Sequence, residues 1–266
     1  MDFLNLTGKT FLIAGAANKK SVATFSAKTL IENGAKCIFS VQSEIQAEAV
    51  NKLFPDSPVL FLDVEKKEDI TRLSTEVKKH TKTIDGLLHS LAFANFSEGL
   101  KPFHETKRED YLQAAQISSF SLVEVSNALK ELFTPSASIV TISISNTRAT
   151  SYGYLGPIKA MLDATVPFLA KSFSEFSQVR VNAVGAGPLK TSASAGIPDY
   201  IDNYIFAEAL TLRKKALETQ EVANTVAFLL SERSSGINAS TMMVDAGISC
   251  NYYDQQVVKE FSKNAL

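Results

Sequence analysis

Short apolar runs alternate with longer segments of helical periodicity along most of the chain. Residues 10–14 (TFLIA) predict a buried strand, and residues 22–33 predict a helix that ends at Gly34. Glycine is favoured there because it adopts the left-handed conformation that terminates helices. Further strands are predicted at residues 36–41, 59–62, 86–92, 138–143, 179–183 and 241–244, and further helices at 66–80, 110–133, 157–176 and 221–230.

The predicted strands are apolar throughout and do not alternate between apolar and polar positions. Strands of this kind are buried on both faces, as in a parallel sheet covered by helices on each side. The pattern therefore indicates an α/β fold of the Rossmann type. We expect one doubly wound parallel sheet in a single domain that spans residues 1–266. In such sheets the ligand binds beyond the carboxyl ends of the strands.

Composition and charge argue against several classes of protein. The chain has 266 residues, of which 45% are apolar and 21% charged, as in ordinary globular domains. A net charge of −1 offers no field for nucleic acid or an anionic membrane. The apolar runs are too short to span a bilayer. Cys37 and Cys250 lie far apart and the three histidines are scattered, which disfavours a disulfide framework or a metal site. We expect a soluble, cytoplasmic protein without a metal.

The first candidate for binding chemistry follows the first predicted strand. The segment from Gly15 to Ser21 (GAANKKS) leads directly into a predicted helix. A glycine at such a turn lets the backbone approach a pyrophosphate, and the helix N-terminus attracts the negative charge. The segment does not match the GxGxxG pattern, so by itself it is equally compatible with an ordinary strand-to-helix turn.

The second candidate is a tyrosine and a lysine seven residues apart, Tyr152 and Lys159. On a helix, seven residues make nearly two turns, so both side chains would face the same way about 10 Å apart along the axis. This separation suits one residue at a substrate carbonyl and the other at a cofactor ribose. Without further context, a loop tyrosine and a solvated lysine would be the simpler interpretation.

The seven-residue spacing resembles the enoyl-acyl-carrier-protein reductases of the short-chain dehydrogenase/reductase superfamily. Most other members of the superfamily have the tyrosine four residues before the lysine, where this chain has Leu155. The resemblance extends over almost the whole chain through short motifs in the same order. They are residues 6–9 (LTGK), Gly15 with 21–23 (SVA), 63–64 (DV), 85–86 (DG), 89–94 (HSLAFA), 117–121 (ISSFS), 180–184 (RVNAV), 186–191 (AGPLKT) and 244–247 (VDAG).

The resemblance implies an oxidoreductase that reduces the 2,3 double bond of enoyl thioesters on acyl carrier protein in fatty-acid synthesis. Tyr152 would stabilise the enolate oxygen and Lys159 would bind the nicotinamide ribose. Ala94, Ile144 and Tyr152 would face the thioester. The other implied dinucleotide contacts are Gly15, Ser21, Val22, Gln42, Asp63, Val64, Leu91, Leu189, Lys190, Thr191, Ser192 and Ala193.

The residues after the second strand predict which nicotinamide cofactor is preferred. A 2′-phosphate requires a cation at this point, usually an arginine. The chain has residues 41–44 (VQSE) here, without a lysine or arginine and with an acid. We therefore expect NADH in preference to NADPH, unless Lys19 and Lys20 of the glycine turn reach the phosphate.

Two positions depart from the family pattern. Phe25 replaces a usual glycine in the first helix, and its ring is expected to crowd the packing of that helix on the sheet. Ile144 replaces a usual aromatic residue, which places the wall of the acyl pocket in question. These departures leave open a catalytically weak paralogue that binds dinucleotide as a sensor or partner. A ketone or alcohol dehydrogenase is a second alternative, but the four-residue spacing that marks it is absent.

Several further expectations concern parts of the chain outside the central motifs. The resemblance implies that a helical segment at about 192–212 covers the acyl chain, and its large apolar residues are expected on roughly one side. They are Ile197, Tyr200, Ile201, Tyr204, Ile205 and Leu210. The family is usually tetrameric, so a homotetramer built on the helices at 110–133 and 157–176 is expected. We interpret His89 as a hydrogen-bonded structural residue and Ser143 as part of the strand packing.

Overall fold

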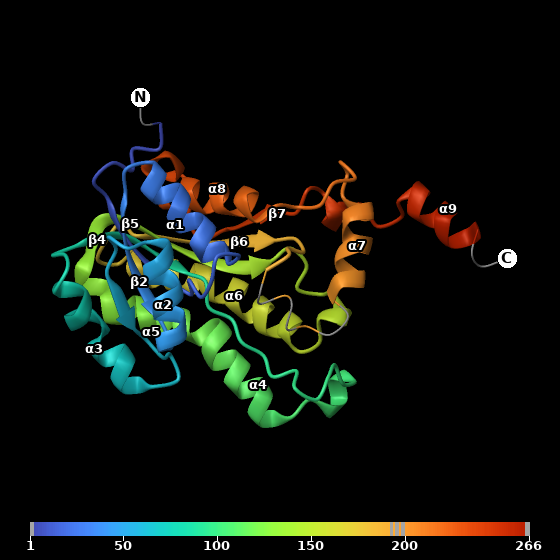
Figure 1. The fold of residues 1–266 in the computed structure, drawn as a ribbon, viewed down its shortest axis with the longest axis horizontal. Coiled ribbons are helices and arrows are strands. Elements are labelled where there is room, and N and C mark those ends of the chain that lie inside the picture. The colour runs from blue at the N-terminus through green and yellow to red at the C-terminus, as the bar shows by residue number, and fades with distance from the viewer. Residues whose placement is uncertain (1–2, 192–193, 195–196, 198–199, 264–266) are drawn as a thin grey trace.

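A seven-stranded parallel sheet forms the centre of the computed structural model, which describes residues 3–191, 194, 197 and 200–263 (Figure 1). Its strand order is β3-β2-β1-β4-β5-β6-β7, and neighbouring strands are parallel. The strands are β1 (Thr10–Ala14), β2 (Lys36–Val41), β3 (Val59–Phe61), β4 (Ile84–His89), β5 (Phe133–Ile144), β6 (Arg180–Ala186) and β7 (Thr241–Val244). The predicted doubly wound fold is confirmed.

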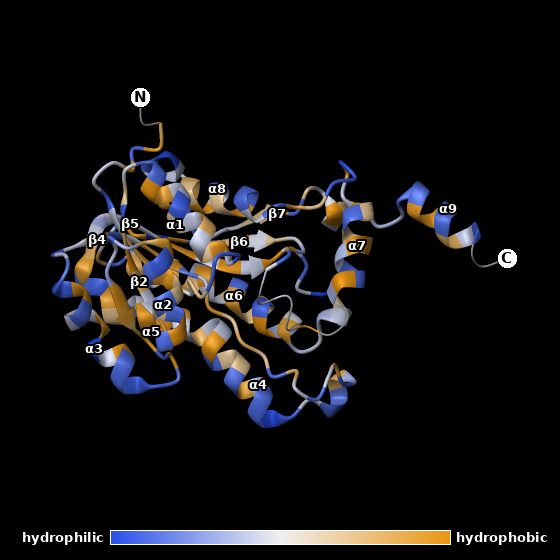
Figure 2. Cartoon of the chain, viewed as in Figure 1, coloured by the Kyte–Doolittle hydropathy of each residue, from blue (hydrophilic) through white to orange (hydrophobic). Residues whose placement is uncertain are grey.

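Helices pack against both faces of the sheet. The α-helices of the described residues are α1 (Val22–Glu32), α2 (Glu44–Leu53), α3 (Lys67–Lys78), α4 (Arg108–Ala115), α5 (Ser121–Leu129), α6 (Leu155–Phe173), α7 (Tyr200–Leu210), α8 (Thr219–Leu230) and α9 (Gln255–Lys263). Residues of α1, α2 and α8 form one buried cluster, and residues of α3, α5 and α6 form a second. Figure 2 shows the apolar residues gathered on the strands between these layers.

The faces of β1 show how the two clusters are divided. Phe11 and Ile13 belong to the first cluster, whereas Leu12 belongs to the second. Successive side chains of a strand point to opposite faces, so a strand that is covered on both sides must be apolar at every position. This requirement explains the continuous apolar runs of the sequence.

The helix predicted at residues 110–133 is wrong in detail. It consists of α4, a π-helical segment at Gln116–Phe120, α5 and a 3₁₀ turn at Lys130–Leu132, after which β5 already begins at Phe133. The Ser118 hydroxyl in the π segment accepts a hydrogen bond from the Phe93 N–H at 2.9 Å and donates one to the Phe93 carbonyl at 3.0 Å. The irregular turn therefore holds the loop after β4, and π segments often occur at such functional positions.

Three other differences concern segments whose apolar pattern is misleading. β4 ends at His89, because the residues that follow leave the sheet as a loop. α2 was not predicted; its buried residues are Ala47 and Val50, and the others are polar, half-buried or, at Ile45, exposed. α9 was not predicted either; its side chains are exposed or half-buried, and it extends away from the sheet (Figure 1).

The crowding expected at Phe25 does not occur. Its ring is half-buried at the side of α1 and lies 5.9 Å from the Lys28 ammonium. Ala23 and Ala27, both fully buried, fill the close contact of the helix with the core instead. Within the described part of the chain, none of the helices is both long and apolar enough to cross a membrane.

Candidate active site

Gly15 lies where β1 ends, next to the end of β4. These strands pair with each other although β2 and β3 separate them in sequence, so this is the switch point of the sheet. Gly15 has φ +100°, and a Cβ atom built there would lie 2.1 Å from the Ser90 carbonyl oxygen. Both the left-handed backbone and the lack of space require glycine. The glycine turn therefore lies at the position where doubly wound sheets bind ligands.

The N-terminus of α1 follows this turn and suits an anion. Ser21 is the N-cap, and its hydroxyl accepts a hydrogen bond from the Thr24 N–H at 3.1 Å. The first helical turn is uncharged, while the preceding Lys19 and Lys20 are exposed. The helix dipole and the two lysines both favour negative charge here.

Lys159 is buried in α6 with only 5% of its surface exposed. Its ammonium donates a hydrogen bond to the Ile142 carbonyl of β5 at 2.8 Å. Burial lowers the pKa of Lys159 to about 8, and Asp163, one turn further along the helix, opposes this shift. The side chain therefore still carries its charge at neutral pH, held against the carboxyl end of β5.

The sequence predicts Tyr152 and Lys159 on one helix, but Tyr152 lies before that helix begins. It ends a short 3₁₀ turn, and α6 begins three residues later, after Gly153 with φ +59°. Burial raises the pKa of the Tyr152 phenol, and the nearby Tyr200 raises it further. The phenol is therefore a neutral hydrogen-bond donor. The argument from a regular two-turn helical spacing is wrong, although both residues flank the same end of α6.

The residues expected at the adenosine lie along the carboxyl edge of β2 and β3. Gln42 follows β2 and is exposed. The Asp63 carboxylate, after β3, accepts a hydrogen bond from the Glu65 N–H at 3.1 Å and pairs with Lys66 at 3.2 Å. Val64 is buried beside it.

Leu91 lies on the other side of the glycine turn. Its Cδ2 atom is 3.3 Å from the Cβ position built on Gly15. Val22 is buried in the first turn of α1. Together with the adenosine-side residues, these positions follow one continuous edge of the sheet on either side of β1. Their contacts with a dinucleotide stay predictions.

The residues expected to face the thioester lie near the start of α6. Ala94 packs in a small apolar cluster that contains Tyr154 and Ile158. Ile144 is the last residue of β5, half-buried and paired with Ala186 of β6. A small cavity of about 40 Å³ opens beside this cluster, lined in part by Phe96 and Tyr154.

The loop after β6 is fastened to α7. The Leu189 N–H donates a hydrogen bond to the Tyr200 hydroxyl at 2.9 Å. The Lys190 ammonium lies 4.4 Å from the centre of the Tyr204 ring. The Thr191 N–H donates to the Ser194 hydroxyl at 2.9 Å. Ser192 and Ala193 lie outside the described residues. Sequence reasoning missed the hydroxyl contacts of Tyr200 and Ser194, because the partners meet only when the loop folds.

The prediction that the large apolar residues of α7 lie on one side of the helix is wrong. Tyr204 and Ala207 are buried, whereas Ile201, Ile205 and Phe206 are more than half exposed. The helix therefore packs on the protein through Tyr204 and Ala207 and presents a separate apolar face outward.

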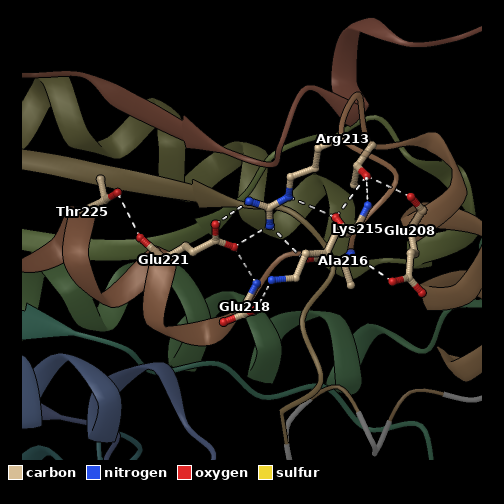
Figure 3. A network of polar contacts seen from close by, with 8 residues as sticks. Glu208, Arg213, Lys215, Ala216, Glu218, Glu221 and Thr225 are labelled. Carbon is tan, nitrogen blue, oxygen red and sulfur yellow. Dashed lines mark hydrogen bonds and ion pairs between the residues drawn. The ribbon is translucent and has the colours of Figure 1, made fainter.

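The C-terminal end of α7 is anchored by a polar network (Figure 3). The Arg213 guanidinium makes two hydrogen bonds to the Glu221 carboxylate, at 2.5 and 2.6 Å. It also donates to the Ala216 carbonyl at 2.8 Å, and Glu221 accepts a hydrogen bond from the Glu218 N–H at 2.8 Å. The turn between α7 and the first turn of α8 is thereby held in place.

Two buried polar residues have structural roles. His89 is fully buried between the Thr141 hydroxyl, 3.0 Å from Nδ1, and the Ser121 hydroxyl, 2.8 Å from Nε2. Burial and the nearby Lys159 lower its pKa to about 3, so the ring is neutral. The structural interpretation of His89 is confirmed. Ser143 is buried in β5 against the Asp163 carboxyl, as expected of strand packing. The described residues include no cluster of three or more His, Cys, Asp or Glu side chains suited to a metal ion.

A parallel sheet of this order, with a glycine turn at its switch point and a buried lysine near the carboxyl end of β5, is typical of dinucleotide-binding oxidoreductases of the short-chain dehydrogenase/reductase class. Comparison with known proteins gives the family. The family model described as enoyl-(acyl carrier protein) reductase matches residues 15–249. The chain belongs to this family.

Curated relatives and a solved structure agree with this assignment. Enoyl-[acyl-carrier-protein] reductase [NADPH] FabI of Staphylococcus aureus is 35% identical over 92% of this chain and 98% of its own. The NADH-dependent FabI of Nostoc is 36% identical over 92% and 97%. The crystal structure of FabI from Candidatus Liberibacter asiaticus is 28% identical, with a TM-score of 0.88 over 92% of this chain and 96% of that one.

Proposed function

We propose that this protein reduces the 2,3 double bond of enoyl thioesters carried by acyl carrier protein, in fatty-acid synthesis, with NADH as its preferred cofactor. The observation that carries the proposal is the buried, protonated Lys159, held by the Ile142 carbonyl near the carboxyl end of β5 in a sheet whose switch point has a glycine turn. Family membership supports the reaction class.

The residues present fit a dinucleotide. Gly15 allows the tight turn after β1, since any side chain there would meet the Ser90 carbonyl, and the α1 N-terminus with Ser21 and Val22 offers a positive end to a pyrophosphate. Lys159 is held at the carboxyl end of β5, where it would bind the nicotinamide ribose. The remaining contacts that we propose are Gln42, Asp63, Val64 and Leu91 on the adenosine side, and Leu189, Lys190, Thr191, Ser192 and Ala193 on the nicotinamide side.

The bound cofactor supplies the hydride, and the protein stabilises the charge that results. Addition of hydride to the β-carbon places negative charge on the thioester oxygen. Tyr152 donates a hydrogen bond to that oxygen, and this kind of stabilisation contributes a few kcal/mol. The raised pKa of Tyr152 keeps its proton in place up to alkaline pH. The charge of Lys159 adds a favourable field. Ala94 and Ile144 form part of the wall against which the acyl group lies.

The preference for NADH rests on the segment after β2. Gln42 uses its N–H for the Gln46 side chain at 2.8 Å, and Glu44 stands in the first turn of α2. An acid at this point disfavours a 2′-phosphate. The relatives include enzymes named for either cofactor, so the test is the ratio of kcat/KM for NADH and NADPH. If NADPH were preferred, and a Lys19→Gln, Lys20→Gln variant reversed the preference, the glycine-turn lysines would be the phosphate site.

We further propose one domain over residues 1–266 in which α7 and its flanking residues, about 192–212, cover the acyl chain. The assembly would be a homotetramer in the cytoplasm. Exposed apolar side chains support the assembly, because Leu112 and Phe120 of the α4–π segment and Phe168 of α6 are each more than half exposed. Two free cysteines, Cys37 and Cys250, fit a reducing compartment. Sedimentation of the purified protein tests the assembly.

A single spectrophotometric assay tests the reaction. Oxidation of NADH is followed with enoyl thioesters of several chain lengths, and a ketone substrate serves as the comparison. Turnover of the enoyl thioester alone supports the proposal, and turnover of the ketone would indicate a ketone or alcohol dehydrogenase. NADH binding without turnover at any chain length would indicate a dinucleotide-binding sensor.

Tyr152→Phe provides the matched test of mechanism. It should lower kcat by at least about tenfold while leaving the Kd for NADH almost unchanged, since the phenol serves the substrate oxygen. A large loss of NADH binding in this variant would contradict the assigned role.

A further inference from the structure

Two tyrosines one turn apart on α7 contact consecutive residues of the loop after β6. The Tyr200 hydroxyl accepts the hydrogen bond of the Leu189 N–H at 2.9 Å, and the Tyr204 ring lies beneath the Lys190 ammonium. Leu189 is buried three residues beyond the end of β6. The N-terminal end of α7 is therefore fastened to the backbone at the ligand edge of the sheet.

The Tyr200 phenol is partly shielded from solvent. It is half-buried, and burial raises its pKa, while the Leu189 N–H and the Ser194 hydroxyl oppose that shift. The Tyr200 phenol also raises the pKa of Tyr152, which indicates that the two phenols are neighbours. A neutral hydroxyl in this place is an acceptor for the Leu189 N–H and lies beside the catalytic tyrosine.

A peptide N–H has one hydrogen, and it donates at full strength to one acceptor. In the proposed function, Leu189 contacts the cofactor on its nicotinamide side. The carboxamide oxygen of the nicotinamide is an acceptor, as the Tyr200 hydroxyl is. The two acceptors then compete for one donor. The other end of α7 is held by Arg213 and Glu221, so release of Tyr200 frees the helix at its N-terminal end.

We propose that Tyr200 is a positioning residue that holds the Leu189 N–H until the nicotinamide carboxamide takes it, so that cofactor binding releases the N-terminal end of α7. The inference rests on the proposed function, because it requires a nicotinamide cofactor at this loop. It assigns to Tyr200 a link between the cofactor site and the segment that covers the acyl chain.

Tyr200→Phe tests the competition because it keeps the ring and removes the acceptor. In the variant the Leu189 N–H has lost this partner before the cofactor arrives. The affinity for NADH should rise about two- to tenfold, the value of one hydrogen bond. ADP-ribose has the same pyrophosphate and adenosine but lacks the nicotinamide, so its Kd should not change. Tyr252→Phe, at a tyrosine that is 83% exposed, is the matched control for both ligands.

The possible outcomes separate the two proposals. Weaker NADH binding, an unchanged Kd for NADH, or equal changes for NADH and ADP-ribose in Tyr200→Phe would overturn the role of Tyr200. If NADH failed to bind the wild type, the proposed function itself would be wrong. Hydrogen exchange over residues 200–210 gives a second test that needs no variant. Exchange should be faster with NADH bound than with ADP-ribose bound, and equal or slower exchange with NADH would also overturn the proposal.

Discussion

Lys159→Met should abolish turnover and yet stabilise the protein. Lys159 is almost completely buried, and its pKa of about 8 lies well below the ordinary lysine value of 10.5. That difference corresponds to a cost of about 3 kcal/mol for keeping the ammonium charged in the folded state at pH 7. The lost hydrogen bond to the Ile142 carbonyl offsets about 1 kcal/mol. We therefore expect a net gain of about 2 kcal/mol in the free energy of unfolding. Functional sites often carry this kind of destabilising group.

The pH dependence of the gain identifies its cause. A lysine whose pKa is lowered by folding loses its proton first in the folded state, so the unfolded state binds more protons between pH 8 and 10.5. Wild-type stability must rise with pH in this window through this residue. Between pH 7 and 9.5 the cost decreases by about 2 kcal/mol. The advantage of Lys159→Met should therefore nearly disappear at pH 9.5.

Urea unfolding of both proteins at pH 7 and 9.5, at one fixed protein concentration, measures the effect. Lys171→Met is the matched control, because Lys171 stands on the same helix and is 73% exposed, where substitutions change stability by about 0.5 kcal/mol or less. A Lys159→Met protein less stable than wild type at pH 7, or an advantage that does not change with pH, would refute the reasoning.

Three further predictions concern the backbone, a buried histidine and the acyl pocket. Gly15→Ala should destabilise the protein by at least about 2 kcal/mol and abolish NADH binding, since its Cβ would meet the Ser90 carbonyl. Gly236→Ala is the control and should do neither, because its methyl group meets no atom of the described residues within 4 Å. His89 has a pKa of about 3 in the folded protein and is neutral there, whereas it takes up a proton in the unfolded state as the pH falls from 7 to 5. In urea titrations the free energy of unfolding of the wild type should therefore fall over this range by about 2 kcal/mol more than that of His89→Gln. Equal losses in the two proteins would contradict this. Ile144→Tyr and Ile144→Phe should shift the chain-length preference alike, by about 1–3 kcal/mol in kcat/KM. If the wild type were inert and Ile144→Tyr alone restored activity, a missing hydroxyl would be the cause instead.

Much of the fold was predictable because burial on both faces of a parallel sheet leaves a direct trace in the sequence. The predicted strands at residues 10–14, 36–41 and 241–244 have the observed bounds, and the first two are the buried strands that their apolar runs indicated. α2 left no comparable trace. It buries only Ala47 and Val50, too few residues to produce a helical period.

The residue types of the candidate site were also visible in the sequence, because a glycine turn and a tyrosine–lysine pair are local features. Their geometry was not. Tyr152 lies in a 3₁₀ turn that precedes α6, and Phe25 turns away from the contact it was expected to crowd. Both outcomes depend on how a helix is rotated against neighbours that are distant in the sequence.

The sequence by itself determined the succession of the seven strands, the edge of the sheet where a ligand is expected, and the chemical groups at that edge. Only the tertiary structure decided the state of those groups. The lowered pKa of Lys159 follows from burial against β5, and the contact of Tyr200 with Leu189 follows from the return of α7 over the loop after β6. Desolvation and hydrogen bonding between distant segments depend on which atoms surround a group. A local pattern of residues does not contain that information.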